Sequence, residues 1–339
     1  MLLTRDDFRK NVFERDGHKC VMCGNPAQDA HHIIERRLFS DGGYYLDNGA
    51  SLCGKCHILA EQTTISAQEL RDKIGISKVV LPDHLYSDQE YDKWGNPILA
   101  NGQRLKGDLF FDSSVQKILT EGKVLHLFTE YVKYPRTYHV MWSPGKTNDD
   151  RAHKSLDHFV GKDVVIHLKM DGENASFYHD YYHARSLDMA NHPSRKWAKI
   201  LHSQIMGDIP PGWRICAENL YAMHSIYYTN LEAYVLAFSI WDDKNFCLGW
   251  DETQEWFTLL NLPQVPVLYE GPFSEEVLHK IEADLDFEKD EGYVMRTYDG
   301  FHYNDFRKWV AKYVRKGHVH HQDGHWANRP IVPNVLASK

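Results

Sequence analysis

The sequence lacks any apolar run of the kind that crosses a membrane. A transmembrane helix needs about 18 or more consecutive apolar residues, and no such stretch is present. The first ten residues, MLLTRDDFRK, carry charges where a secretory signal has its apolar stretch. We therefore expect a cytoplasmic protein.

Excess positive charge is also missing. The formal net charge is −8, which argues against a protein that wraps nucleic acid non-specifically, because phosphate binding needs local positive charge. An enzyme with basic residues along one groove remains compatible with this value. Residues 136–146 and 306–318 are basic segments that could line such a groove, or could simply be solvated surface.

Cysteine is sparse and unevenly placed. The six cysteines form two CxxC pairs, with Cys216 and Cys247 as singles. In a reducing compartment, pairs with this spacing indicate metal ligands rather than disulfides. Internal repeats and low-complexity tracts are absent as well, and the 42% apolar and 25% charged contents are ordinary for a globular protein.

The 339 residues suit two domains. We expect a small metal module in residues 1–75, an ordered extension in 76–125 and a larger domain in 126–339. The extension is rich in turn-forming residues, but its aromatic residues argue against a free tether.

Apolar, β-branched stretches predict strands in the larger domain, at residues 164–169, 234–241 and 292–296. Capping residues predict helices that begin near Ser66, Ser194 and Ser274. In the second of these helices we expect Trp197, Ile200 and Leu201 to share one face. Because strands dominate and helices interleave irregularly, the fold class we expect is α+β, built on antiparallel sheets.

The two CxxC pairs, Cys20/Cys23 and Cys53/Cys56, are separated by about thirty residues. Each CxxC turn places two thiolates on one side of a metal, and two turns complete a tetrahedral shell. The sequence therefore predicts a structural Zn²⁺ site. The alternative is four unrelated buried cysteines.

Polar residues around these cysteines resemble the HNH endonuclease family. The matching residues are Ala30-His31-His32-Ile33, Asp47-Asn48 and Cys56-His57. The resemblance implies a ββα-metal fold around one catalytic divalent ion. His32 would be the general base that activates water, and His31 and His57 would hold the ion. Asn48 would orient the base or join the shell.

A second interpretation of this module stays open: a zinc fold that only binds nucleic acid or a partner. The cluster Glu35, Arg36 and Arg37, directly after the histidine pair, has no role that the resemblance assigns.

The larger domain contains Lys169-Met-Asp-Gly172 at the end of a predicted strand. Strand alternation places His167, Lys169 and Asp171 on one face. A KxDG tetrapeptide alone is weak evidence, because a solvated lysine usually explains it.

Further motifs follow this tetrapeptide in a fixed order. They are KMDGEN at 169–174, HARS at 183–186, CAENLY at 216–221, LAFSIW at 236–241, EGYVMR at 291–296 and VAKYVR at 310–315. Together they resemble the covalent nucleotidyltransferase superfamily, and KxDGxN with EGYV is most similar to RNA ligases of the phage RNA ligase 2 type.

This resemblance implies an ATP-dependent reaction through a lysyl-AMP intermediate on Lys169. The amine must be unprotonated to attack the α-phosphate, so we expect neighbouring cations or desolvation to lower its pKa. AMP would then pass to a 5′-phosphate and be displaced by a 3′-hydroxyl, with Mg²⁺ or Mn²⁺ neutralising phosphate charge.

The resemblance also assigns residues. Asp171 and Asn174 would shape the pocket, Arg185 would contact AMP or the 5′-phosphate, and Glu218 would bind ribose. Phe238 would stack on adenine, although Trp241 or a tyrosine could replace it. Glu291 would help to bind the catalytic metal, and Lys312 would hold the α-phosphate.

The last motif departs from the ligase pattern, since Val310 stands where a second lysine is usual. Lys308 or Arg315 would then assist Lys312. Few residues follow, which leaves no room for the OB-type barrel of DNA ligases and capping enzymes, and favours an RNA ligase. The histidine-rich residues 318–325 are expected to be a polar end rather than a metal site.

The sequence therefore predicts an ATP-dependent RNA ligase with a Zn²⁺-containing HNH module that either cleaves or binds nucleic acid. Two alternatives remain. One is an HNH nuclease with a nucleotide-sensing ligase-like domain, and the other is a DNA-active ligase with a non-catalytic zinc module.

Overall fold

The computed structural model describes residues 2–76, 78–87, 89–99, 102–129, 131–147, 150–185, 192–317 and 330–338. The chain forms two compact units, residues 1–132 and 133–339. The extension predicted at 76–125 is part of the first unit, and the histidine-rich residues 318–325 lie outside the described residues. Among the described helices, none has both the length and the apolar character needed to cross a bilayer.

The first unit is built around a two-stranded sheet followed by a helix. Strand β1 (Asp29–His32) pairs antiparallel with β2 (Gly49–Leu52), and α2 (Gly54–Glu61) follows directly. Helix α1 (Arg5–Arg15), capped by the Thr4 side chain, contacts both strands. This ββα arrangement, with its four clustered cysteines, fits the small zinc module that the sequence predicts.

The remainder of the first unit packs beside this motif. Helix α3 (Ala67–Ile74) begins with the predicted capping box, in which Ser66 and Glu69 exchange hydrogen bonds. A hairpin of β3 (Glu90–Tyr91) and β4 (Pro97–Ile98) follows, and α4 (Ser113–Glu121) closes the unit. Short 3₁₀ turns lie at η1 (Arg36–Leu38), η2 (Leu46–Asn48), η3 (Asp108–Phe111) and η4 (Leu125–Leu127).

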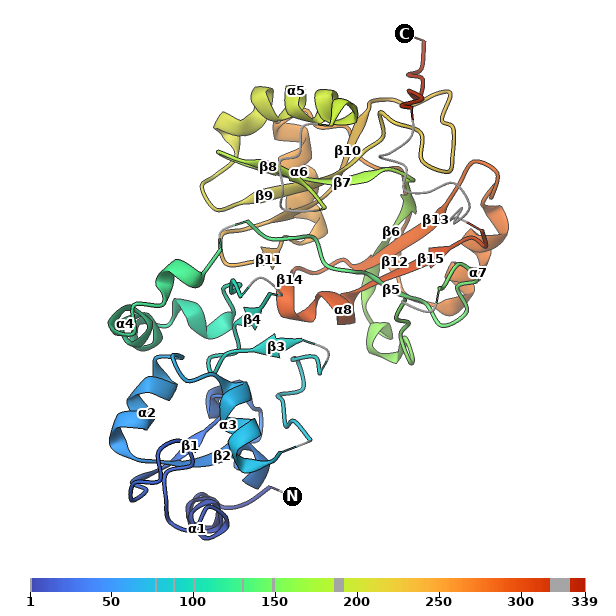
Figure 1. The fold of residues 1–339 in the computed structure, drawn as a ribbon. Helices are drawn as coiled ribbons and strands as arrows, with labels where there is room; N and C mark the ends of the chain where they lie inside the picture. The colour runs from blue at the N-terminus through green and yellow to red at the C-terminus, as the bar shows by residue number, and fades with distance from the viewer. Residues whose placement is uncertain are drawn as a thin grey trace. The chain divides into compact units, whose positions relative to one another are not determined.

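The second unit contains two sheets that are antiparallel except for one parallel pair among the described strands, β15 with β5. The five-stranded sheet has the order β12-β6-β13-β15-β5 and the six-stranded sheet has the order β14-β11-β10-β9-β7-β8. Figure 1 shows the six-stranded sheet on the left of this unit and the five-stranded sheet on its right.

The strands of the five-stranded sheet are β5 (Tyr138–His139), β6 (Asp163–Lys169), β12 (Val267–Pro272), β13 (Gly292–Thr297) and β15 (Val310–Val314). Those of the six-stranded sheet are β7 (Glu173–Tyr178), β8 (Tyr182–Ala184), β9 (Arg214–Asn219), β10 (Val235–Trp241), β11 (Phe246–Cys247) and β14 (Phe301–His302). The three predicted strands are confirmed as β6, β10 and β13, and so is the α+β class.

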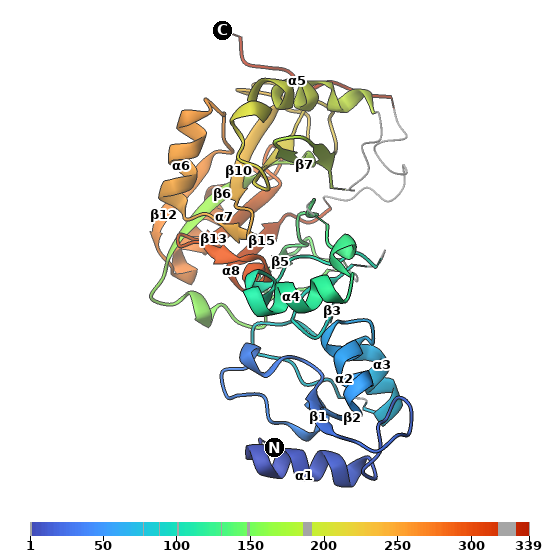
Figure 2. The same ribbon diagram turned by 90° about the vertical axis from the view of Figure 1, so that its left-hand side faces the viewer.

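Helices cover the outer faces of the sheets. Helices α5 (Lys196–Ile205) and α6 (Trp250–Leu259) contact the six-stranded sheet, and Figure 2 shows α5 lying over it. Helix α7 (Glu275–Asp284), capped by Ser274 as predicted, buries Leu278 against the five-stranded sheet. The remaining elements are α8 (Phe306–Trp309) and the 3₁₀ turns η5 (Asp157–Phe159), η6 (Pro193–Arg195), η7 (Met206–Asp208) and η8 (Tyr303–Asp305). The inner faces of the two sheets are left to form a cleft.

The start of α5 differs from the prediction. Ser194 is not its N-cap but lies buried within η6, so the helix begins at Lys196. The predicted apolar face is also rotated, because Ala198 and Ile205 are buried whereas Trp197 is 40% exposed. A proline-initiated 3₁₀ turn that runs straight into the helix shifts the helical register away from the serine.

Candidate active site and metal centres

Lys169 is the last residue of β6 and lies beside the start of β13. The register pairs Lys169 with Gly292, and the Lys169 ammonium donates a hydrogen bond to Glu291 Oε2. Gly292 has a φ of 150°, and a Cβ atom there would lie 1.9 Å from the Tyr313 carbonyl oxygen. Only glycine lets β13 approach β15 in this way, so Gly292 fixes the position of Glu291.

The charges around Lys169 differ from the expectation. Burial disfavours the ammonium, but the carboxylates of Glu291 and Glu218 outweigh burial and raise the pKa of the amine. Burial raises the pKa of Glu218 to about 8, although Lys169 opposes this shift. The predicted lowering of the Lys169 pKa is therefore wrong for this arrangement. A neutral amine requires that the facing carboxylates first be neutralised, by protons or by a divalent cation.

Asp171 lies beyond the end of β6, in the turn towards β7. Its Oδ2 atom accepts hydrogen bonds from Ser225 N at 2.7 Å, Ser225 Oγ at 2.8 Å and Ile226 N at 2.8 Å. A Cβ atom on Gly172 would lie 2.6 Å from the Asn219 carbonyl oxygen, so the turn needs glycine to pass β9. Asp171 thus anchors the loop next to Lys169 and is not one of the cleft-lining residues.

The cleft between the sheets collects most of the residues predicted from the motifs. Asn174 on β7 is paired with Glu218 on β9, and both line the cleft with Lys169. The Asn174 Oδ1 atom is buried without a hydrogen-bond partner, which leaves an acceptor ready for a ligand. Phe238 on β10 also lines the cleft, where Tyr134 packs edge-on against it with ring centroids 5.2 Å apart.

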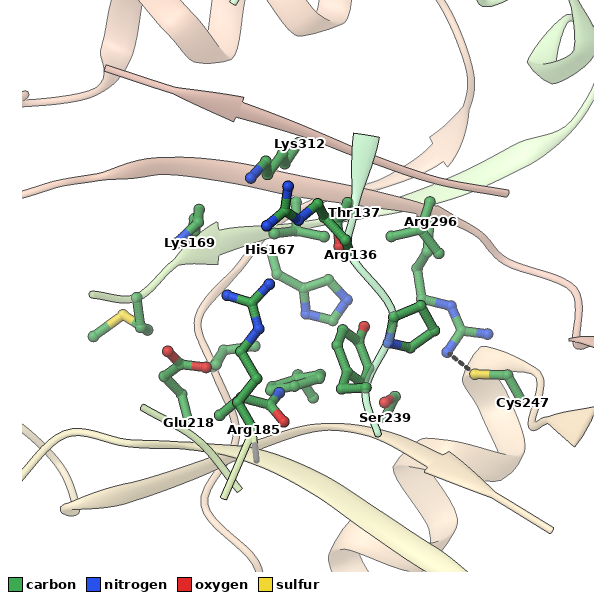
Figure 3. Close-up of a pocket in the computed structure, with 18 of the residues that line it drawn as sticks. Arg136, Thr137, His167, Lys169, Arg185, Glu218, Ser239, Cys247, Arg296 and Lys312 are labelled. Carbon is green, nitrogen blue, oxygen red and sulfur yellow. Dashed lines mark hydrogen bonds between the residues drawn. The ribbon is translucent and has the colours of Figure 1, made fainter. Parts of the chain in front are cut away.

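Cationic side chains line the same cleft. Lys312 on β15 and Arg185 after β8 are both lining residues, and Figure 3 shows Lys169, Lys312, Arg136 and Arg185 directed into a common space. Burial and the nearby Lys169 lower the pKa of Lys312 to about 8, whereas Asp150, 3.9 Å away, opposes the shift. Such a group of cations suits a polyphosphate.

The two candidate partners of Lys312 lie elsewhere. Lys308 is exposed on α8 with its ammonium 4.6 Å from the centre of the Trp309 ring, and it does not line the cleft. Arg315 donates a hydrogen bond to Ser225 Oγ at 3.4 Å and is also absent from the lining.

Several lining residues were not assigned from the sequence. The segment Tyr134–Thr137 enters the cleft and contributes Arg136, which belongs to a segment that the charge pattern marked as a candidate groove. His167, two residues before Lys169, is buried, and neither of its ring nitrogens has a hydrogen-bond partner. Arg296 lines the cleft but is directed to the Cys247 Sγ atom, 3.3 Å away (Figure 3). Its guanidinium therefore has a structural partner.

In the first unit, Cys20, Cys23, Cys53 and Cys56 converge. Their sulfur atoms all lie within 4.8 Å of one another, with Cys23 to Cys53 at 3.6 Å and Cys23 to Cys56 at 3.7 Å. Four sulfurs at about 2.3 Å from a central Zn²⁺ have nearly this spacing. Burial opposes ionisation of Cys20, but backbone N–H groups outweigh it and lower the pKa of that thiol to about 7. The donor set fits Zn²⁺.

A second cluster combines His31, His57 and Glu61, whose ligand atoms also lie within 4.8 Å of one another. Glu61 Oε1 is 3.3 Å from His31 Nδ1 and 3.3 Å from His57 Nε2. Burial, followed by the charge of Lys93, lowers the pKa of His31 to about 3, so its imidazole is neutral, and its buried Nε2 atom has no hydrogen-bond partner. Two imidazoles and a carboxylate in this arrangement fit a divalent ion.

Glu61 was not predicted from the sequence as a metal ligand, although its spacing from His57 could have indicated it. It follows His57 by four residues on α2, and this spacing places two side chains on the same helix face.

His32 and Asn48 lie beside this cluster rather than in it. Successive strand residues point to opposite faces, so His32 stacks on Phe8 with ring centroids 4.5 Å apart while His31 faces α2. Burial lowers the pKa of His32 to about 4, which keeps it neutral but makes it a weak base. Asn48 exchanges hydrogen bonds with the backbone of Ile34 and donates to Gly43 O at 3.2 Å. Its amide therefore holds the segment that follows His32.

Comparison with known families matches the two sites to two different families, one in each unit. Residues 162–314 match the family model described as RNA ligase, and residues 20–62 match the one described as HNH endonuclease. Residues 162–314 are thus similar to RNA ligases and residues 20–62 to HNH endonucleases, as the motifs indicate. Comparison with curated proteins finds no match.

Solved structures give only partial overlaps. A candidate ATP-dependent DNA ligase from Aquifex aeolicus is 20% identical, with a TM-score of 0.38 over 55% of this chain and 50% of that one. A Naegleria gruberi RNA ligase mutant with ATP and Mn is 16% identical, with a TM-score of 0.39 over 55% and 57%. An archaeal ATP-dependent RNA ligase is 14% identical, with a TM-score of 0.41 over 76% and 64%. The chain therefore spans only half to two thirds of the length of these structures.

Proposed function

We propose that the second unit is an ATP-dependent polynucleotide ligase that joins a 3′-hydroxyl to a 5′-phosphate, with RNA as the preferred strand. The observation that carries this proposal is the convergence of Lys169, Glu218, Arg185 and Lys312 in one cleft. In this cleft a single amine, that of Lys169, faces the carboxyl group of Glu218 and two cations that could bind phosphate. The match of residues 162–314 to the RNA ligase family supports the preference for RNA.

The proposed reaction has three phosphoryl transfers. The neutral Lys169 amine attacks the α-phosphorus of ATP, a P–N bond forms, the P–O bond to pyrophosphate breaks, and the nitrogen releases one of its two protons. A 5′-phosphate oxygen of the nucleic acid then attacks the same phosphorus, the P–N bond breaks, and the amine takes up a proton as it leaves. Finally the 3′-hydroxyl loses its proton and attacks the 5′-phosphorus, and AMP leaves. Each step depends on positioning and on neutralised phosphate charge.

The described residues divide these tasks. Lys312 and Arg185 would bind phosphate oxygens, with Arg136 in place of Lys308 as the further cation. Glu218 and the unpaired Asn174 Oδ1 atom would contact the nucleoside sugar, and Phe238 with Tyr134 would form an apolar wall against adenine.

Glu291 has a double role in this scheme. It keeps the Lys169 amine protonated, because a facing carboxylate stabilises the ammonium. A Mg²⁺ or Mn²⁺ ion would be held at Glu291 and would supply charge neutralisation at the phosphates. With such an ion bound, this carboxylate would no longer hold the Lys169 proton, so nucleotide loading and amine deprotonation would be linked.

A strand-joining assay tests the proposal. Nicked duplexes with an RNA or a DNA 3′-hydroxyl strand are incubated with ATP and Mg²⁺, and joined product is measured on denaturing gels. We expect joining that depends on Lys169 and is faster with the RNA 3′-hydroxyl. Faster sealing of the all-DNA nick would favour the DNA ligase alternative. ATP binding without joining of any substrate would favour the nucleotide-sensing alternative.

We further propose that the first unit is a single-ion HNH nuclease. The observation in its favour is the cluster of His31, His57 and Glu61 next to His32. The cluster would hold the ion against a scissile phosphate, and His32 would accept a proton from the attacking water. The competing function is a zinc module that only binds nucleic acid and delivers the ligase.

Cleavage of plasmid DNA and of RNA, with Mg²⁺ or Mn²⁺, separates these two functions. We expect His57→Ala to abolish cutting while strand joining continues, and Lys169→Ala to do the reverse. If the unmodified chain cuts no substrate with either ion but still binds nucleic acid through its first unit, the binding function is the correct one.

A further inference from the structure

Lys93 lies in the turn between β3 and β4, outside the residues that match the HNH family. Its side chain is only 5% exposed. The turn is rigid, because Asp92 Oδ1 accepts hydrogen bonds from Trp94 N at 2.9 Å and Asn96 N at 3.1 Å. Trp94 Nε1 also donates to Glu61 O at 2.8 Å, which attaches the turn to the end of α2. Lys93 is therefore held in place by structure on both sides.

The Lys93 ammonium has three oxygen partners. It lies 3.1 Å from Glu35 Oε2, 3.2 Å from Glu61 Oε1 and 3.2 Å from the His32 carbonyl oxygen. Glu61 Oε1 is also the atom that lies 3.3 Å from both His31 and His57. One carboxylate oxygen thus serves the histidine cluster and a buried cation together.

Charge counting shows what this arrangement does to a metal ion. Imidazoles bind metals in their neutral form, so the charges near the cluster come from three carboxylates and two cations. The carboxylates are Glu35, Glu61 and Asp29, which lies 3.5 Å from His57 Nδ1. The cations are Lys93 and Arg37, which lies 3.3 Å from Glu35. The two cations cancel two of the three carboxylates. A divalent ion next to Glu61 would then meet a fixed positive charge at close range, in surroundings where water screens poorly. With the ion in place, the site carries a net positive charge.

We propose that Lys93 makes divalent-ion binding by His31, His57 and Glu61 conditional on a phosphate group of nucleic acid. This inference rests on the proposed function of the HNH module as a metal centre. Alone, the ion is repelled by Lys93. A phosphate that contacts both the ion and the ammonium removes this repulsion, so ion and nucleic acid bind each more tightly in the presence of the other. A nuclease centre in a chain that also joins strands would thereby load its ion only on substrate.

The test measures free Mn²⁺ by electron paramagnetic resonance with the zinc-loaded full chain and no ATP. His57→Ala identifies the Mn²⁺ bound at the cluster. We expect Lys93→Met to bind this Mn²⁺ at least about tenfold more tightly than the unmodified chain, because the repelling charge is gone. Lys93→Arg keeps the charge and should stay close to the unmodified chain.

A second variant gives an effect of opposite sign. Glu35 contacts Lys93 but is not part of the ligand cluster. Glu35→Gln removes the charge that compensates Lys93, so Mn²⁺ affinity should fall.

The effect of a phosphate group on Mn²⁺ binding is measured by adding a DNA duplex with phosphorothioate linkages that resist cleavage. This duplex should increase the Mn²⁺ affinity of the unmodified chain by at least about tenfold and that of Lys93→Met by much less.

The outcomes separate the inference from the proposed function. Equal Mn²⁺ affinity of the unmodified chain and Lys93→Met, with binding that needs His57, would overturn the role of Lys93 alone. Mn²⁺ binding that is unaffected by His57→Ala in every variant would overturn the metal centre as well. Opposite shifts for Lys93→Met and Glu35→Gln support the inference even if no nucleic acid is cut.

Discussion

Lys169 and Glu291 form a partly buried ion pair across adjacent strands, at the point where β6 ends and β13 begins. The two residues are far apart in the sequence, and the strand register that pairs Lys169 with Gly292 brings them together. The pair holds the amine in its charged form and points it into the cleft. The proposed nucleophile, and the group that we propose controls its proton, are thus brought together by one strand register.

Glu291→Gln tests the proposed double role of that carboxylate. The substitution removes a charge that raises the Lys169 pKa, and also removes the oxygen proposed to hold the catalytic ion. We expect the rate of adenylate formation to fall by at least about tenfold, because the loss of charge neutralisation outweighs easier deprotonation. The acidic limb of the pH–rate profile should move to lower pH, and an unchanged profile would contradict the pairing.

Lys312 and Lys308 offer a matched comparison within one motif. Lys312 lies in the cleft, whereas Lys308 is exposed on α8 over the Trp309 ring. We expect Lys312→Ala to slow adenylate formation by about 100-fold or more, since a cation aimed at the phosphates is lost. Lys308→Ala should stay within about threefold of the unmodified rate. Equal losses would show that α8 also reaches the nucleotide.

The partly buried carboxyl of Glu218 predicts a pH-dependent stability. Its folded-state pKa of about 8 exceeds the ordinary value of glutamate, so the folded chain keeps a proton that the unfolded chain releases. The contribution to stability is present below the ordinary pKa and is lost as the pH rises towards about 8. Glu218→Gln should therefore raise the melting temperature by about 2–4 °C near pH 8 and change it little near pH 5. A melting temperature that falls at pH 8 would contradict this sign.

The four-cysteine cluster predicts a zinc-dependent first unit. Cys53→Ser should remove bound zinc and make residues 1–75 sensitive to proteolysis, because structural zinc supplies much of the folding free energy of a small module. Cys216→Ser is the control, since Cys216 is buried in the second unit, 3.8 Å from Ser176 Oγ. Zinc released by chelation is measured with a metal-sensitive dye, and full zinc content in Cys53→Ser would argue against the site.

The sequence was most informative where chemistry repeats in a fixed order. Lys169, Glu218 and Lys312 could be predicted to share a site because each stands in a motif with a set neighbour pattern, and the structure places all three in one cleft. Strand periodicity located β6, β10 and β13. The helix start near Ser194 was predicted wrongly, because a 3₁₀ turn changes the register without any break in the apolar pattern. The assignment of Lys308 remains a prediction that its exposure does not favour.

Residues that act through tertiary contacts left little or no local signal. Lys93 reaches the histidine cluster only because a separate hairpin packs against α2, and its neighbours in the sequence do not indicate that contact. Arg136 enters the cleft from a segment that precedes all the ligase motifs. The raised pKa of Lys169 likewise depends on two strands that meet only in the folded sheet.

The most direct test of the central proposal is transfer of label from ATP to the chain. The protein, freed of bound AMP by pyrophosphate and then dialysed, is incubated with Mg²⁺ and α-³²P-ATP, alongside Lys169→Ala and Lys308→Ala. We expect label on the denatured unmodified chain and on Lys308→Ala, but not on Lys169→Ala, with the acid lability of a phosphoramidate bond. Absence of label from the unmodified chain, or equal label on Lys169→Ala, would contradict the lysyl-adenylate.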